Sequence, residues 1–210
     1  MIYLDSNATT KPLPEVVEAM SNCLAEDWAN PSSMHRPGAK ARQLIDQSRE
    51  DVATLIGCRR RDIVFTSGGT ESALLAIRGA MAANPTRTHM ATSSLEHSVL
   101  RDQASRLEAE GQTVHRLKHL PGGLLDMDHL EDLLSQHAED LAIVSVMWVN
   151  NETGVVQPIN AIGALCREHG VLFHTDAVQA VGKMPVDCAS LNVDLLGFSA
   201  HKFHGPKGVG

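Results

Sequence analysis

The chain has 210 residues, with 25 acidic side chains against 18 Lys and Arg, and its formal net charge is -7. This balance argues against a nucleic-acid-binding protein, which needs a basic face for its phosphate contacts. Aromatic residues make up only 3% of the chain, too few for the base-stacking platforms of single-strand-binding proteins. With 43% hydrophobic and 20% charged residues the composition is globular, and the length suits one large domain.

No apolar run approaches the ~20 residues of a membrane span, and the first residues lack the pattern of a signal peptide. We therefore expect a cytoplasmic protein without a membrane partner. The four cysteines, Cys23, Cys58, Cys166 and Cys188, lie far apart without a CxxC pair, which favours reduced and mostly buried thiols. The 11 histidines lack paired-ligand spacing near carboxylates or thiols, so no metal site is expected.

Two helices are predicted first, one from Pro14 to about Trp28 and one over 36–57. The second has apolar side chains at helical spacing and Gly57 as its C-terminal stop, and we expect it to face the core. Strands are then expected at 62–67, 88–93, 113–117, 141–147, 171–176 and 194–200, with helices at 70–83, 98–110, 128–137 and 159–169. This alternation predicts an α/β fold with a mainly parallel sheet and helices on both faces.

The first candidate site is the segment TSGGTE over 66–71, which follows the first expected strand. Ligands of a parallel sheet bind beyond the carboxyl ends of its strands. Here Gly69 lets the backbone approach an anion, Thr70 adds a hydroxyl, and the start of the next helix supplies free N–H groups. The segment predicts a phosphate site, although it lacks the spacing of a Walker loop, and a plain glycine turn capped by Thr70 is an equal alternative.

Three further segments offer polar side chains after expected strands. His97 follows the second strand and is either a helix cap or a functional imidazole. Asn151, in the polar run after the fourth strand, either belongs to a turn or presents an amide to a ligand. Asp176 ends the fifth strand, where a buried carboxylate needs a partner such as a protonated heterocyclic nitrogen.

The last segment places a hydroxyl, an imidazole and an amine close together in Ser199, His201 and Lys202. A lysine whose pKa is lowered by burial or by charge forms a Schiff base, although a surface loop is the commoner explanation of such a segment alone. Taken together, a phosphate site, an imidazole for a ring face, a carboxylate for a ring nitrogen and an amine for an aldehyde meet the four needs of pyridoxal phosphate (PLP). We therefore predict PLP as the cofactor.

Seven motifs, in a fixed order, now carry a resemblance. They are YLDSNATT (3–10), NPSSMHRPG (30–38), TSGGTES (66–72), LEHSV (95–99), VNNETG (149–154), HTDAVQ (174–179) and SAHKFHGPKG (199–208). The sequence resembles the cysteine desulfurases, which are class-V aminotransferase-like enzymes of PLP fold type I. The resemblance implies an N-terminal arm over 1–13, a PLP-binding large domain over 14–210, and a homodimer.

The resemblance also implies a role for each candidate residue. Lys202 binds PLP as a Schiff base, His97 stacks on the ring and takes part in proton transfer, and Asp176 holds the ring nitrogen. Around the rest of the cofactor it implies Gln179 and Asn151 near the phenolic oxygen, Asn151 also at the substrate carboxylate, and Gly69, Thr70, Ser199 and His201 at the phosphate. The implied reaction converts L-cysteine to L-alanine and an enzyme persulfide, which serves an iron–sulfur scaffold or another sulfur acceptor.

Two features depart from the family pattern. Ala73-Leu74-Leu75 stand where the family usually has an Asn-rich stretch. The family also continues well beyond position 210, so we expect this chain to lack the sulfur-accepting cysteine, the arginine for the substrate carboxylate and the C-terminal small domain. None of the four cysteines matches that nucleophile, since three are expected in helices and Cys188 in a linker. A selenocysteine lyase, a class-V aminotransferase and a non-catalytic fragment of the PLP fold remain as alternatives.

Overall fold

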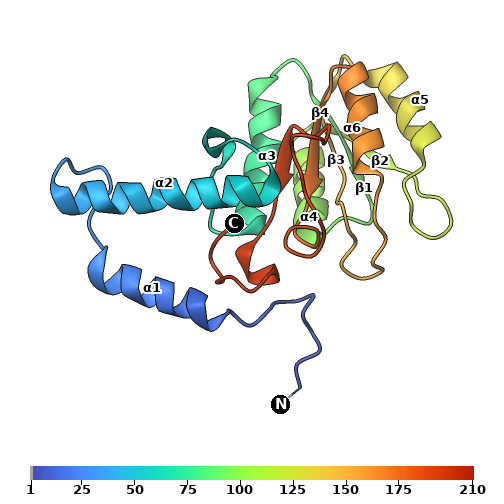
Figure 1. Cartoon of the computed structure of the whole chain (residues 1–210). Coiled ribbons are helices and arrows are strands. Elements are labelled where there is room, and N and C mark those ends of the chain that lie inside the picture. The colour runs from blue at the N-terminus through green and yellow to red at the C-terminus, as the bar shows by residue number, and fades with distance from the viewer. Residues whose placement is uncertain (1) are drawn as a thin grey trace.

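The computed structural model describes residues 2–210. At its centre lies a sheet of five parallel strands in the order β2-β1-β3-β4-β5 (Figure 1). The strands are β1 (His89–Ser93), β2 (Thr113–Leu117), β3 (Leu141–Ser145), β4 (Leu172–Asp176) and β5 (Leu195–Gly197). The α/β fold with a mainly parallel sheet, expected from the alternation of apolar runs and helices, is confirmed.

Six α-helices and two short 3-10 turns accompany the sheet in the described residues. They are α1 (Pro14–Glu26), α2 (Arg36–Ile56), η1 (Arg60–Asp62), α3 (Gly69–Ala83), α4 (Ser98–Ala109), α5 (Met127–His137), α6 (Ile159–Glu168) and η2 (Ala200–Lys202). Every α-helix ends within about two residues of its predicted range, because caps and apolar periodicity mark helix ends in the sequence. No helix within residues 2–210 is both long enough and apolar enough to span a bilayer.

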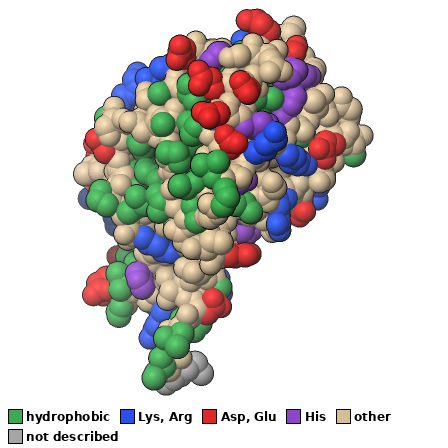
Figure 2. All heavy atoms as spheres, turned by 90° about the vertical axis from the view of Figure 1, so that its right-hand side faces the viewer, with side chains coloured by type: hydrophobic (Ala, Val, Ile, Leu, Met, Phe, Trp, Pro, Cys, Tyr) green, Lys and Arg blue, Asp and Glu red, His purple; other side chains and the backbone are tan. Residues whose placement is uncertain are grey.

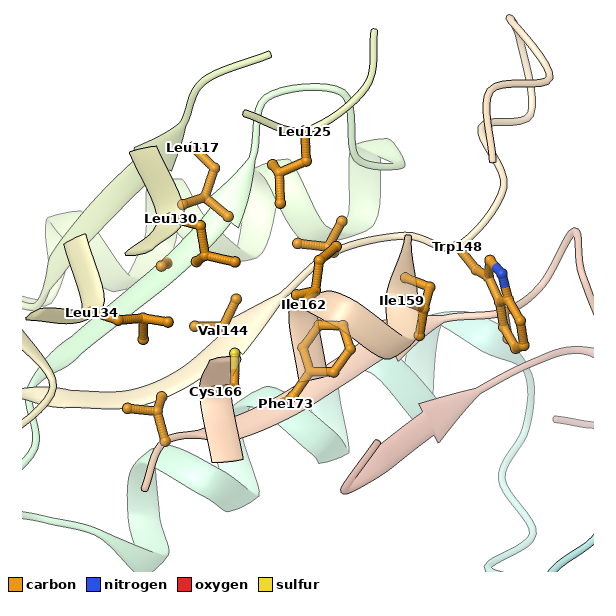
Figure 3. Close-up of a cluster of buried hydrophobic side chains, with 14 of the residues drawn as sticks. Leu117, Leu125, Leu130, Leu134, Val144, Trp148, Ile159, Ile162, Cys166 and Phe173 are labelled. Carbon is orange, nitrogen blue, oxygen red and sulfur yellow. The ribbon is translucent and has the colours of Figure 1, made fainter. Parts of the chain in front are cut away.

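The helices cover both faces of the sheet. Neighbouring residues of a strand point to opposite faces, so Met90 and Ile143 pack against α3 and α4, whereas Ala91 and Val144 pack against α5 and α6. Figure 3 shows part of the larger core, where the fully buried ring of Phe173 lies beside α6. The sheet is therefore buried on both sides, which explains why its strands read as nearly continuous apolar runs.

The strand expected at 62–67 is wrong. Residues 63–66 belong to no strand, although Ile63 has extended backbone angles. Within residues 2–210 this segment has one reciprocal pair of backbone hydrogen bonds, between Thr66 and Gly210, at 2.8 and 3.0 Å. A strand needs a continuing ladder with a neighbour, and an apolar run by itself does not supply one.

The expectation that α2 faces the core is only partly met. The helix buries four residues, among them Ala41 and Ile56, whereas Leu44 and Leu55 are 40% and 48% exposed. Figure 1 shows that α1 and α2 lie to one side of the sheet and the helices that flank it. Periodicity identified α2 as an amphipathic helix, but the position of the helix relative to the sheet decides which apolar side chains are covered.

Gly163 allows α6 to lie against the loop before β5, and we predict that Gly163→Ala destabilises the fold. A Cβ atom at this buried position would overlap the carbonyl oxygen of Asn192, a backbone atom that cannot move alone. Overpacking of this kind costs roughly 1–3 kcal/mol. The matched control is Gly79→Ala in α3, where a Cβ meets nothing within 4 Å. The control should gain up to about 1 kcal/mol from helix propensity, and urea unfolding of both variants measures the difference.

The strand order fixes where a ligand can enter. From β1 the chain passes to β2 on one side, and β3 then lies on the other side of β1, so the order reverses between β1 and β3. Open parallel sheets bind ligands at the carboxyl ends of their strands beside such a reversal. The segments that follow β1 and β3, at 94–97 and 146–151, flank this point.

Candidate active site

One cavity of about 610 Å³ lies at the carboxyl ends of the strands. All nine residues that the sequence singled out line it, namely Gly69, Thr70, His97, Asn151, Asp176, Gln179, Ser199, His201 and Lys202. They come from the start of α3, the cap of α4, the segments after β3 and β4, and the turn η2. The tertiary structure thus gathers in one place residues that are up to 133 positions apart in sequence, from 69 to 202.

The start of α3 forms one wall of the cavity. Gly69 begins the helix, and a Cβ atom added there would lie 3.2 Å from Val178 and 3.5 Å from Ser199, so glycine permits the close approach of these segments. The first N–H groups of a helix have no acceptor within it and carry the positive end of the helix dipole. With the Thr70 side chain exposed beside them, these groups suit a phosphate or another anion.

His97 caps α4 and also lines the cavity. Its Nδ1 atom accepts a hydrogen bond from the N–H of Val99 at 3.3 Å. His97 can therefore be both a helix cap and a functional imidazole, the two interpretations that the sequence left open. Because Nδ1 acts as an acceptor, a neutral ring carries its proton on Nε2.

Of the two adjacent asparagines after β3, one forms the turn and the other faces the cavity. The Asn150 side chain closes the turn, since its Oδ1 accepts from the N–H groups of Glu152 and Thr153 at 3.0 and 2.9 Å. Asn151 is the one that lines the cavity, and its carbonyl oxygen accepts from the Asn7 side chain at 3.1 Å. The Asn151 amide makes no hydrogen bond within residues 2–210 and is available to a ligand.

Asp176 places a carboxylate in the cavity at the end of β4. One of its oxygens accepts from the N–H of Val178 at 2.9 Å. Burial raises the pKa of Asp176, and the hydrogen bond from Val178 with the positive charge on His97 and Lys202 opposes this rise. A carboxylate with such limited access to water is stabilised by a further cationic partner.

Lys202 is held by the segment that precedes α1, called the arm below. Its Nζ atom donates to the carbonyl oxygens of Asn7 and Ala8 at 2.6 and 3.0 Å. Burial lowers the pKa of Lys202, while Asp176 and Asp5 raise it in part. The amine is therefore closer to its neutral, nucleophilic form than an ordinary lysine.

Asp5, Asn7 and Ala8 also line the cavity, and the sequence-based assignment of site residues missed them. They belong to the polar run DSNATT, which could have signalled a role, but only its long-range contacts reveal one. Gln179 connects to the same arm, because its side-chain amide donates to the Asn7 carbonyl at 3.1 Å, and its oxygen accepts from Lys183. The arm thus orders the amine and amide groups at the mouth of the cavity.

His201 and Ser199 are fixed by neighbouring segments. Nδ1 of His201 lies 3.0 Å from the Thr9 hydroxyl, and the buried Ser199 hydroxyl donates to the Val209 carbonyl at 3.3 Å. Burial lowers the pKa of His201, and the charges of Lys202 and Lys207 lower it further. A neutral imidazole therefore faces the cavity beside Lys202.

Glu96 is a buried residue next to the cavity. The sequence did not identify it as part of the site. It is 3% exposed, and its Oε1 accepts from the backbone N–H of Met147 at 2.7 Å, which joins the segments after β1 and β3. Burial raises the pKa of Glu96 well above its usual value. The raised pKa favours the neutral acid, and the hydrogen bond to Met147 positions the backbone beside His97.

The four cysteines are free thiols, and none of them lines the cavity. Cys166 is buried, Cys58 and Cys188 are half-buried and Cys23 is exposed, so the expectation of mostly buried thiols holds only in part. Cys58 lies just after α2 and not within a helix as predicted. Burial raises the pKa of Cys166 to about 12 and that of Cys188 to about 11, which keeps these thiols protonated and unreactive.

Comparison with known proteins shows the family to which the chain belongs. The sequence model of the aminotransferase class-V family matches residues 2–210. The chain belongs to the aminotransferase class-V family. Among curated relatives, a cysteine desulfurase of Cereibacter sphaeroides is 46% identical over 211 residues, and cysteine desulfurase IscS of Aeromonas hydrophila is 48% identical over 213 residues. Both alignments cover 100% of this chain, but 54% and 52% of those proteins, so the chain spans about half the length of its relatives.

Solved structures agree on the fold. A structure described as "SspA in complex with cysteine" superposes with a TM-score of 0.93 at 36% identity, over 100% of this chain and 60% of its own. A "NifS-like protein" gives a TM-score of 0.94 at 35% identity, over 99% of this chain and 57% of its own. The class-V fold, with the fold-type-I arrangement expected from the motifs, is confirmed.

Enzymes of this family depend on PLP, and the cavity fits that cofactor. Three groups that line the cavity match three parts of the cofactor. The start of α3 matches the phosphate, the half-buried Asp176 carboxylate matches a protonated ring nitrogen, and the Lys202 amine matches the aldehyde. When bound, PLP supplies an aldehyde for amines and a ring that stabilises negative charge at the substrate Cα.

Proposed function

We propose that the chain carries the PLP machinery of a cysteine desulfurase. The observation that carries the proposal is one cavity lined by all nine residues, in a chain that is 46% and 48% identical to curated cysteine desulfurases. The proposed reaction consumes L-cysteine and a thiol and yields L-alanine and a persulfide. The C–S bond of cysteine breaks, the sulfur joins the thiol sulfur, and a proton replaces the sulfur on the alanine side chain.

We assign the residues as follows. Lys202 attaches PLP covalently, and Asp176 keeps the ring nitrogen protonated. Gly69, Thr70, Ser199 and His201 bind the phosphate together with the free N–H groups of α3. Gln179 and Asn151 lie near the phenolic oxygen, and the free amide of Asn151 also binds the substrate carboxylate.

His97 and Lys202 are the proposed carriers of protons. Because Nδ1 of His97 already accepts a hydrogen bond, the imidazole would stack on the cofactor and its Nε2 would exchange a proton with the reacting atoms. The lowered pKa of Lys202 favours the neutral amine, which is the form that can accept a proton. Residues 1–13 serve in this proposal as an arm that closes the cavity of the large domain formed by 14–210.

The sulfur acceptor is, in this proposal, a thiol other than the four cysteines of this chain. They lie outside the cavity, and the raised pKa values of Cys58, Cys166 and Cys188 oppose a nucleophilic role. We further propose a cytoplasmic homodimer whose persulfide sulfur passes to an iron–sulfur scaffold or another sulfur acceptor, as the resemblance to cysteine desulfurases implies.

The test is a substrate comparison with the purified chain and added PLP, with dithiothreitol as the thiol. L-cysteine should give sulfide and L-alanine in equal amounts, and Lys202→Ala should give neither. The exposed Lys118→Ala is the matched control and should behave as the wild type. Preference for selenocysteine, or transfer of the amino group to a keto acid, would replace the proposal by a selenocysteine lyase or an aminotransferase. Covalent PLP without turnover of any substrate would assign this chain the non-catalytic alternative.

A further inference from the structure

Three histidine side chains from three elements meet near the amino ends of the strands, away from the cavity. His89 begins β1, His115 lies in β2 and His137 ends α5. Each offers one ring nitrogen, and the three nitrogens lie within 4.8 Å of one another. Figure 2 shows histidine side chains gathered towards the top of the molecule, beside acidic ones. The sequence argument against a metal site considered spacing along the chain and could not detect this cluster.

The strand register brings the first two rings together. His89 pairs with Thr113 and His115 pairs with Ala91, so the two histidines stand diagonally on one face of neighbouring strands. Nε2 of His115 lies 3.1 Å from Nδ1 of His89. Two nitrogens bound to one zinc ion at ~2.0–2.1 Å in tetrahedral geometry are about 3.4 Å apart, so this pair is already close to the separation of two ligands.

The third ring is brought in by the end of α5. Its centroid lies 4.8 Å from that of His115 and 5.9 Å from that of His89. The backbone fixes this position, since the carbonyl of His137 accepts from the N–H of Asp140 at 3.0 Å, and the Asp140 carbonyl accepts from the N–H of His89 at 2.9 Å. The cluster is therefore built on three elements joined by backbone hydrogen bonds.

A hydrogen bond between His89 and His115 would explain two of the three rings but not the third. Within residues 2–210 the His137 ring has no hydrogen-bond partner, although it is half-buried against the other two. Three neighbouring imidazoles also repel one another when protonated. Neutral imidazoles are the form that binds metals.

We propose that His89, His115 and His137 bind one divalent transition-metal ion, with zinc as the preferred ion. Imidazole nitrogens suit zinc, and a set of three leaves a fourth coordination position for water or another ligand. The site is distinct from the PLP cavity, because it lies near the amino ends of β1 and β2. A bound ion would link β1, β2 and α5.

The experiment uses the full chain with PLP, without a histidine tag and after treatment with a chelator. Calorimetric titration with ZnCl₂ at neutral pH should show one ion per chain. Each of His115→Gln and His137→Gln should weaken binding by more than the ~10–100-fold that loss of an outer-shell partner causes. His169→Gln, a half-buried histidine at the end of α6 outside the cluster, should bind as the wild type.

Cobalt(II) is the second probe, because its visible spectrum separates nitrogen from thiolate ligands. The expected spectrum is that of a nitrogen-bound ion without thiolate charge transfer. Circular dichroism and the PLP absorbance of each variant must match the wild type, which shows that the variant is folded. Absence of a stoichiometric zinc site in the wild type, equal affinity in His137→Gln, or a thiolate band would each overturn the proposal.

Discussion

Lys202→Ala should abolish covalent attachment of PLP to this chain. The wild type incubated with PLP should develop the visible absorbance of a lysine-bound cofactor, and borohydride should trap PLP on Lys202. The variant should show neither, because Lys202 is the amine that lines the cavity beside Asp176. Absorbance spectroscopy, followed by peptide mapping of the reduced protein, measures the effect.

The pH dependence of attachment provides a further readout. Only the neutral amine attacks an aldehyde, and burial lowers the pKa of Lys202 below that of an ordinary lysine. The attachment rate should therefore rise with pH and then reach a plateau. The midpoint of the rise should lie below the usual lysine pKa of about 10.4. Lys118→Ala, with the same change at an exposed position, should retain the full signal and the same midpoint. Equal trapping in wild type and Lys202→Ala would show that Lys202 is not the attachment site.

Glu96→Ala should lower the free energy of unfolding by roughly 2–4 kcal/mol. The change leaves the buried N–H of Met147 without its acceptor, which costs about 1–3 kcal/mol, and opens a small cavity beneath the site. Glu96→Gln keeps an oxygen acceptor and the side-chain volume, so its loss should be much smaller. Urea unfolding of the three proteins measures these differences.

Glu96 should also make stability depend on pH in a predictable direction. Burial raises its pKa in the folded state, so the folded chain binds more protons than the unfolded chain above the usual glutamate pKa of about 4.3. The stabilisation of the folded state that results from this shift is fully present below the usual glutamate pKa. It is lost as pH rises through the raised pKa of the folded state. Glu96→Gln should remove this loss, while the exposed Glu131→Gln should not. Parallel pH profiles for wild type and Glu96→Gln would contradict a raised pKa.

The sequence by itself determined the class of fold and nine of the residues that line the cavity. Apolar runs and caps are local signals, and they located all six helices and five of the six expected strands. Residues at strand ends share one edge of a parallel sheet, and this rule identified positions such as His97, Asp176 and Lys202 before their contacts were known. The motifs around these residues then indicated the family that the comparison confirmed.

Only the tertiary structure decided contacts between segments far apart in the chain. The arm reaches Lys202 through backbone carbonyls of Asn7 and Ala8, which carry no side-chain signal in the sequence. The apolar face of α2 is exposed because of where the helix lies relative to the sheet. The apolar periodicity of the sequence would be the same if that face were covered. His89, His115 and His137 share no spacing motif, because strand register and the end of α5 bring them together. Local patterns are set by neighbouring residues, whereas burial and clustering are set by how whole elements pack.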